Sequence, residues 1–178
     1  MSKQLEIVLC GVGGQGLVSG GAIVCEAIVC EENRYATLST LYGSEVRGTF
    51  ARSEIVVSDN PIIFPEALRP DIVVTLAQVA YNQYAGSMIQ DSILLYDSEL
   101  VANIIESPAE QYAIPFTKIA RNIGSVIAGN MVGIGYANAI CGFCSISSLE
   151  NAIRNTFKEN VKICDINIKA LHAGFTIY

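Results

Sequence analysis

The residues best suited to ligand chemistry form the glycine-rich segment Gly11–Gly16, with the sequence GVGGQG. It directly follows the apolar run Leu5–Cys10 and precedes another apolar stretch, which predicts a tight turn between a strand and a helix. Glycine tolerates positive φ and has no Cβ, so the N–H groups of such a turn can converge on an anion. The positive end of the helix dipole acts at the same place. We therefore expect a phosphate- or carboxylate-binding turn, formed by Gly11, Gly13, Gly14, Gln15 and Gly16.

The same segment matches the dinucleotide-binding pattern G-x-G-x-x-G at Gly11, Gly13 and Gly16. That pattern also needs an acidic residue at the end of the second strand, about 20 residues on, to bind a ribose hydroxyl. The region after Arg34 offers hydroxyl side chains but no acid before Glu45. An ordinary NAD site is therefore disfavoured. Two interpretations stay open: an anion-binding turn of another kind, or glycines that serve only close packing of a helix on a strand.

A second dense motif, LYGSEVRGT, covers Leu41–Thr49 and holds Tyr42, Glu45 and Arg47 between loop-forming glycines. Binding residues concentrate on loops that a rigid sheet positions. Arg47 is suited to a bidentate contact with a phosphate or carboxylate. The alternative is that Glu45 and Arg47 pair with each other and fix the turn. If this loop lies beside the glycine turn, the two motifs support one shared site.

Six cysteines lie mostly in apolar sequence, and one pair forms the C-x-x-C motif Cys141–Cys144. A closed metal site needs about four ligands, whereas this pair and Cys164 supply three. A thioredoxin-like motif would begin a helix after a strand, but this pair follows a long apolar stretch. Structural thiols are the favoured interpretation, with no metal site. An iron–sulfur carrier built on these three cysteines is the alternative.

Asn130 lies within an apolar helical stretch and must find a hydrogen-bond partner there. That partner could belong to a neighbouring loop, another subunit or a ligand, and the loop is the default. The lone His172 near the C-terminus is expected on the surface. No nucleophile–base arrangement or carboxylate pair stands out in the sequence, so we assign no catalytic residue.

The composition points to a single domain that packs against another chain. Hydrophobic residues make up 51% and charged residues 16% of the sequence, against about 25% charged in a typical chain. The net charge is −6 and basic residues form no stripe, which argues against nucleic acid. The apolar stretch Ile119–Phe143 is interrupted by polar residues, so no membrane span is expected. With no signal peptide evident, reduced thiols in the cytoplasm are the expectation.

Short apolar strands that alternate with helical segments predict an α/β fold, a three-layer α/β/α sandwich with a mixed, mostly parallel sheet. The connection between the second and third strands, from Thr40 to Thr49, is too short for the helical crossover that parallel strands need. We therefore expect an antiparallel section there. The predicted strands are Leu5–Cys10, Arg34–Thr40, Thr49–Val57, Asp71–Ala77, Ser92–Tyr96 and the short Tyr112–Phe116.

Four helices can be placed from periodicity and end signals. A first helix is predicted over Gln15–Cys30 and a long one from Thr117 to about Ile140. The run SSLE at Ser147–Glu150 fits a capping box and begins a helix to about Glu159. A last short helix is predicted over Ile166–Ala173.

The chain resembles the gamma subunit of the 2-oxoacid:ferredoxin oxidoreductases, with the 2-oxoglutarate type closest and the 2-oxoisovalerate and pyruvate types next. The paired motifs at Gly11–Gly16 and Leu41–Gly48 carry the resemblance, which spans at least Ile7 to about Gly142. One position departs from the pattern, because Thr49 stands where the family has a second glycine after the arginine. Further matching segments are ARSEIVVSDNPI at Ala51–Ile62, RPDIVVTLAQVAY at Arg69–Tyr81 and NMVG at Asn130–Gly133.

The resemblance implies one domain over residues 1–178, similar to the gamma domain of pyruvate:ferredoxin oxidoreductase. Such enzymes oxidatively decarboxylate a 2-oxoacid, form an acyl-CoA and pass electrons to ferredoxin. Thiamine diphosphate and iron–sulfur clusters are then expected on the alpha, beta and ferredoxin-like delta chains, and this chain binds no cofactor tightly. The two motifs and Asn130 would contact coenzyme A or a partner subunit, and a homodimer is plausible for the isolated chain. The rival hypothesis is a free-standing nucleotide- or CoA-binding module.

Overall fold

Residues 4–42 and 49–178 are described by a computed structural model, and they contain a six-stranded sheet with the order β2-β3-β1-β4-β5-β6. β1, β4, β5 and β6 are parallel, whereas β3 is antiparallel to both of its neighbours. The sheet is therefore mixed and mostly parallel, and the antiparallel section falls where the short connection predicted it. The strands are β1 (Leu5–Val12), β2 (Tyr35–Tyr42), β3 (Phe50–Ser58), β4 (Ile72–Thr75), β5 (Ile93–Asp97) and β6 (Glu110–Ile114).

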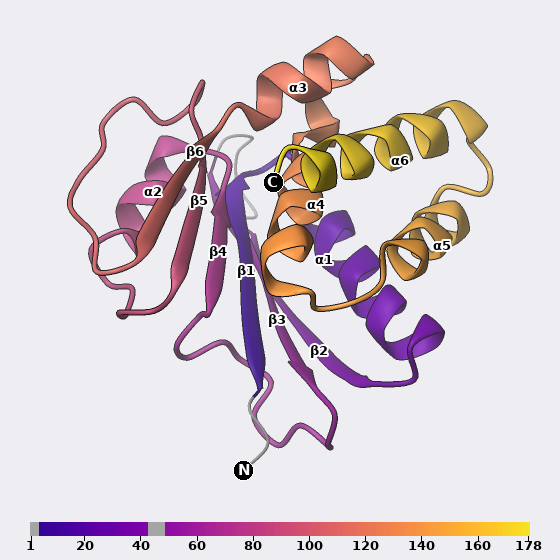
Figure 1. The fold of residues 1–178 in the computed structure, drawn as a ribbon, viewed down its shortest axis with the longest axis horizontal. Helices are drawn as coiled ribbons and strands as arrows, with labels where there is room; N and C mark the ends of the chain where they lie inside the picture. Colours follow the sequence, from indigo (N-terminus) through magenta and orange to yellow (C-terminus); the bar gives the residue numbers. More distant parts are fainter. Residues whose placement is uncertain (1–3, 43–48) are drawn as a thin grey trace.

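The helices divide unequally between the two faces of the sheet (Figure 1). α1, α4, α5 and α6 lie over one face, and their apolar side chains share a core with Ile7, Leu9 and Val74. On the other face α2 packs against β1 and β4, over Val8 and Val73. The helical segments are α1 (Leu17–Glu26), η1 (Ala27–Glu31), α2 (Gln78–Tyr84), α3 (Phe116–Ile123), η2 (Val126–Ala128), α4 (Gly129–Cys141), α5 (Ile146–Thr156) and α6 (Val161–Thr176).

The long helix predicted from Thr117 to Ile140 is wrong, because the chain breaks at Gly124. Gly124 has φ of 124°, a conformation that ends α3 and that side chains rarely adopt. The chain then runs through extended Ser125 and the 3₁₀ turn η2 before α4 begins at Gly129. Within residues 4–42 and 49–178, no helix has the length and apolar character needed to cross a bilayer.

The starts of three other helices also differ from the prediction. α1 begins at Leu17, two residues later than expected, because Gly16 is in a left-handed conformation. Ser145 rather than Ser147 is the N-cap of α5, and its hydroxyl accepts a hydrogen bond from the Ser148 N–H at 3.1 Å. α6 is longer than the predicted Ile166–Ala173, since Asn160 caps it five residues earlier than expected.

α4 packs directly against α6 through glycines. A Cβ on Gly135 would overlap the backbone carbonyl of Leu171, and a Cβ on Gly174 would overlap that of Val132. The two backbones therefore approach more closely than any side chain at these positions would allow.

A π-helical turn, η1, continues α1 and aligns two glutamates with α5. The Asn155 amide donates to Glu26 at 3.0 Å, and the Asn151 amide donates to Glu31 at 2.8 Å. Five residues in a regular α-helix would turn about 140° past the starting direction. The wider π turn instead brings Glu26 and Glu31 to the same side, facing two asparagines one turn apart on α5.

Candidate functional site

The glycine turn follows β1 directly and runs into α1. Gly14 and Gly16 have φ of 97° and 70°, so the sharp reversal uses the conformational freedom that glycine supplies. The Gly13 N–H donates to the Thr49 carbonyl at 3.0 Å, and the Gln15 N–H donates to the Val12 carbonyl at 3.3 Å. Two of the donors expected to face an anion are thus used within the protein.

The Gln15 side chain ties the turn to the next parallel strand. Its amide oxygen accepts from the Val12 N–H at 2.8 Å, and its amide nitrogen donates to the Leu76 carbonyl at 2.6 Å. A Cβ on Gly11 would overlap that amide oxygen. Gly11 is therefore glycine because the Gln15 amide occupies the space beside it.

Asn130 closes the turn from the opposite side. Its amide nitrogen donates to the Gly16 carbonyl at 2.7 Å, and its amide oxygen accepts from the Met131 N–H at 2.7 Å. The partner is thus the neighbouring loop, which confirms the default expectation. Asn130 lies in the first turn of α4 rather than in the middle of a long helix, and a Cβ on Gly16 would lie 2.5 Å from its amide nitrogen.

The second motif begins and ends beside the glycine turn. Tyr42 is the last residue of β2, pairs with Ala51, and is 66% exposed. Ala51 in turn pairs with Gly11, so the three residues form a row across the sheet. The Thr49 carbonyl accepts the Gly13 N–H, as described above. Glu45 and Arg47 lie outside the described residues.

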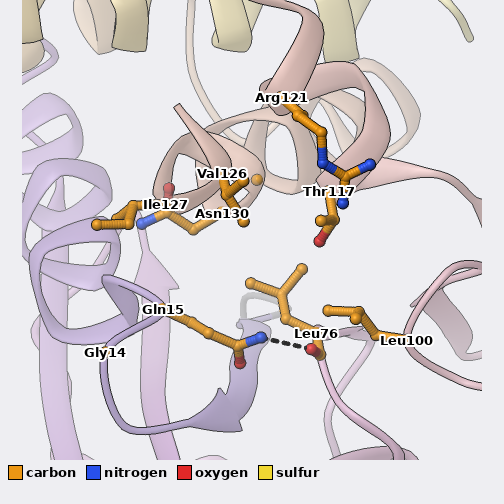
Figure 2. A pocket seen from close by; sticks show the side chains of 10 residues that line it. Gly14, Gln15, Leu76, Leu100, Thr117, Arg121, Val126, Ile127 and Asn130 are labelled. Atoms are coloured by element: carbon orange, nitrogen blue, oxygen red, sulfur yellow. Dashed lines mark hydrogen bonds between the residues drawn. The ribbon is translucent and has the colours of Figure 1, made fainter. Parts of the chain in front are cut away.

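A cavity of about 240 Å³ opens at the carboxyl ends of β1, β4 and β5 (Figure 2). Side chains from α3, η2 and α4 form one wall, and Gln15, Leu76 and Leu100 form the other. In open α/β sheets, ligands bind outside the carboxyl ends of the strands where the connections switch faces. That switch lies here between β1, which leads into α1, and β4, which leads into α2. The lining residues are Gly14, Gln15, Leu76, Leu100, Thr117, Arg121, Val126, Ile127, Gly129 and Asn130.

Two acidic residues fix the wall formed by α3. Asp97 is fully buried at the end of β5, and its carboxylate accepts from the N–H groups of Thr117 and Glu99, both at 2.9 Å. A carboxylate at the start of α3 also interacts favourably with the helix dipole. Glu99 in turn pairs with Arg121 at 3.1 Å. The guanidinium beside the cavity is thus already balanced by a carboxylate.

The cysteines behave as structural thiols. Burial raises the pKa of both Cys25 and Cys144 to about 12, with Glu32 raising that of Cys144 further, and burial raises the pKa of Cys10 well above its usual range. A thiol with such a pKa stays protonated and unreactive near neutral pH. In the part of the chain that the structure describes, no three His, Cys, Asp or Glu side chains are grouped to hold a metal ion. His172 lies on the surface and contacts Glu150 at 2.7 Å.

Several residues of this site carried no strong signal in the sequence. Leu76 contributes a backbone carbonyl, which no residue-type pattern reveals. Asp97 could have been found, because a lone acid that directly follows a buried apolar strand lies at the functional edge of a parallel sheet. Arg121 and the pair Val126 and Ile127 were hidden by the assumption of one continuous helix.

The fold and the site define an open α/β domain with a glycine turn at the point where its connections switch faces. The chain belongs to the pyruvate ferredoxin/flavodoxin oxidoreductase family, whose model matches residues 6–177. Its relatives are subunits of oxidoreductases, which favours an oxidoreductase subunit over a free-standing binding module.

Two curated relatives differ in how they carry this domain. The chain is 35% identical over 175 residues to the 2-oxoglutarate synthase subunit KorC of Methanocaldococcus jannaschii, covering 97% of this chain and 92% of KorC. It is 32% identical over 174 residues to the ketoisovalerate oxidoreductase subunit VorA of Methanothermobacter marburgensis, covering 97% of this chain but 36% of VorA. The domain thus makes up almost all of one relative and about a third of the other.

Solved structures share the fold. The gamma subunit of a keto/oxoacid ferredoxin oxidoreductase from Geobacter sulfurreducens superposes with a TM-score of 0.83 at 30% identity, over 97% of this chain and 96% of that one. The 2-oxoglutarate:ferredoxin oxidoreductase of Magnetococcus marinus, solved with 2-oxoglutarate, coenzyme A and succinyl-CoA bound, gives 0.88 at 20% identity, over 99% of this chain and 31% of that one. At the lower identity the likeness concerns the fold alone.

Proposed function

We propose that this chain is the gamma subunit of a 2-oxoglutarate:ferredoxin oxidoreductase. Such an enzyme decarboxylates 2-oxoglutarate oxidatively, transfers the succinyl group to coenzyme A and passes the electrons to ferredoxin. The observation that carries the proposal is the 35% identity to KorC over 97% of this chain and 92% of KorC. The Magnetococcus marinus enzyme, which has this fold in part of its chain, binds both 2-oxoglutarate and coenzyme A.

In this proposal the chain supports catalysis without supplying the catalytic groups. Thiamine diphosphate and iron–sulfur clusters reside on alpha, beta and ferredoxin-like delta chains of a cytoplasmic complex. Among the described residues that line the cavity, Arg121 is the one ionisable side chain besides neutral polar groups, and Glu99 neutralises it. That composition suits a surface for assembly better than a reaction centre.

The proposed contact surface is the edge that carries both motifs, on the coenzyme A side of the complex. Gln15 and Asn130 spend their amide groups on holding the glycine turn, so the turn presents a rigid backbone rather than a set of free donors. The residues proposed to contact coenzyme A or a partner subunit are Gly11, Gly13, Gly14, Gln15, Gly16, Tyr42, Glu45, Arg47 and Asn130. A homodimer would cover the same apolar edge when the partner chains are missing.

The test is reconstitution. The chain is co-expressed anaerobically with the alpha, beta and delta chains of the same genome, and CoA-dependent reduction of a viologen is measured with 2-oxoglutarate, pyruvate and 3-methyl-2-oxobutanoate. We expect activity with 2-oxoglutarate, none from this chain alone, and a severe loss when it is omitted. Activity of the purified chain alone, or an assembled complex that prefers another 2-oxoacid, would contradict the proposal.

A further inference from the structure

The break at Gly124 exposes two adjacent apolar side chains beside the cavity. Val126 and Ile127 lie in the 3₁₀ turn η2 and are 51% and 61% exposed, whereas the next residue, Ala128, is buried. A regular helix through this segment would not need two neighbouring branched side chains in solvent. Together with Leu100 on the opposite wall, which is 41% exposed, they surround the opening of the cavity (Figure 2).

The cavity is too small and too apolar for a coenzyme. Pockets for small molecules typically enclose about 300–1,000 Å³, whereas this one encloses about 240 Å³. The amide groups of Gln15 and Asn130 are engaged within the turn, and Arg121 is paired with Glu99. What remains open is aliphatic surface, contributed by Leu76, Leu100, Val126 and Ile127. Such a cavity fits one apolar side chain.

The relatives indicate where that side chain comes from. In VorA the domain shares a polypeptide with a remainder of about twice its length, because the match covers 36% of VorA. In KorC the domain makes up 92% of the protein. A remainder that is covalently attached in one relative must be held by surface contacts in the other. The exposed apolar residues at the carboxyl edge of the sheet are available for such contacts.

We propose that the cavity receives one apolar side chain, of leucine or phenylalanine size, from the separate chain that is homologous to the remainder of VorA. This inference rests on the proposed function, because it assumes that the chain works inside an oxidoreductase complex. Binding energy at protein interfaces concentrates in a few apolar anchors that fill pockets near the centre of the contact. Val126, Ile127 and Leu100 would surround such an anchor and exclude water from it.

The test measures binding between the two full-length chains, purified separately from the same genome, by biolayer interferometry. Val126→Asp and Ile127→Asp place a charge at the cavity mouth. Each variant should weaken binding about 30-fold, the equivalent of losing one anchor worth about 2 kcal/mol. Ile63→Asp is the matched control, since Ile63 is 97% exposed in the connection after β3, at the opposite edge of the sheet. It should change binding less than about twofold.

Both cavity variants should keep the thermal midpoint of the free chain, because their side chains are more than half exposed. Wild-type binding by both variants, or an equal loss in Ile63→Asp, would overturn the inference. Normal binding combined with a raised KM for coenzyme A in the assembled enzyme would also overturn it, because the cavity would then belong to the coenzyme. If the wild-type chain itself fails to bind and no complex forms, the proposed function is what fails.

Discussion

Replacing Gly11 with alanine tests whether the glycine turn is organised by the Gln15 side chain. The added Cβ would overlap the Gln15 amide oxygen and lie 3.3 Å from the Leu76 Cβ. The amide must then leave its position. With it go the hydrogen bonds to the Val12 N–H at 2.8 Å and to the Leu76 carbonyl at 2.6 Å.

The cost follows from those two bonds. A hydrogen bond contributes about 0.5–1.5 kcal/mol net, so Gln15→Ala should lower the free energy of unfolding by about 1–3 kcal/mol. Gly11→Ala should cost at least as much, because it breaks the same bonds and crowds Leu76. The double variant should be no less stable than Gln15→Ala, and up to about 1 kcal/mol more stable, since alanine limits the unfolded chain more than glycine does.

The measurement is urea unfolding of the four proteins in a double-mutant cycle, with the midpoint compared at constant m. The expected coupling energy is about 1–3 kcal/mol in favour of the double variant. Losses that simply add would show that Gly11 and Gln15 act independently. The turn would then owe its shape to its backbone alone.

Three further predictions concern packing, capping and pH. Gly135→Ala should lower the thermal midpoint by about 4–8 °C, because its Cβ would overlap the backbone of α6, while Gly86→Ala, whose nearest neighbour would lie 4.0 Å away, should change it little. Ser145→Ala should cost about 1 kcal/mol in urea unfolding and Ser147→Ala almost nothing, since Ser145 is the N-cap; equal losses would refute this assignment. Burial raises the pKa of Cys25 from 9.0 to about 12, so the unfolded chain releases the thiol proton first and stability should fall between about pH 9 and pH 12. A urea midpoint that is unchanged from pH 8 to pH 11 would contradict that reasoning.

The order of strands could be predicted in part because connection lengths limit topology. The short link from Thr40 to Thr49 indicated the antiparallel section, and the apolar runs at Leu5 and Asp71 indicated buried parallel strands. The pairing of β3 with β1 rather than at the sheet edge could not be deduced, since it depends on contacts between segments more than 40 residues apart in sequence. Periodicity records which face of a segment is apolar, but not which segment covers it.

At the candidate site the prediction identified the turn but not its internal chemistry. The sequence pattern placed Gln15 among residues that would meet a ligand, yet its side chain bonds Val12 and Leu76. Gly124 was read as one more small residue in a helix, although a glycine followed by serine is also a helix-end signal. Because that signal was passed over, the apolar pair at Val126 and Ile127 looked like buried helix rather than exposed surface.

The π turn at Ala27–Glu31 has a consequence for how this chain can tolerate changes in length. A π turn is equivalent to one extra residue accommodated within an α-helix. Deleting a single residue there would leave a regular helix and no broken backbone bonds, so the fold itself should survive. Everything that follows would rotate by about 100°, and Glu31 would lose its alignment with Asn151. The extra residue therefore sets the rotational phase between the end of α1 and α5, and shortening the loops could not restore it.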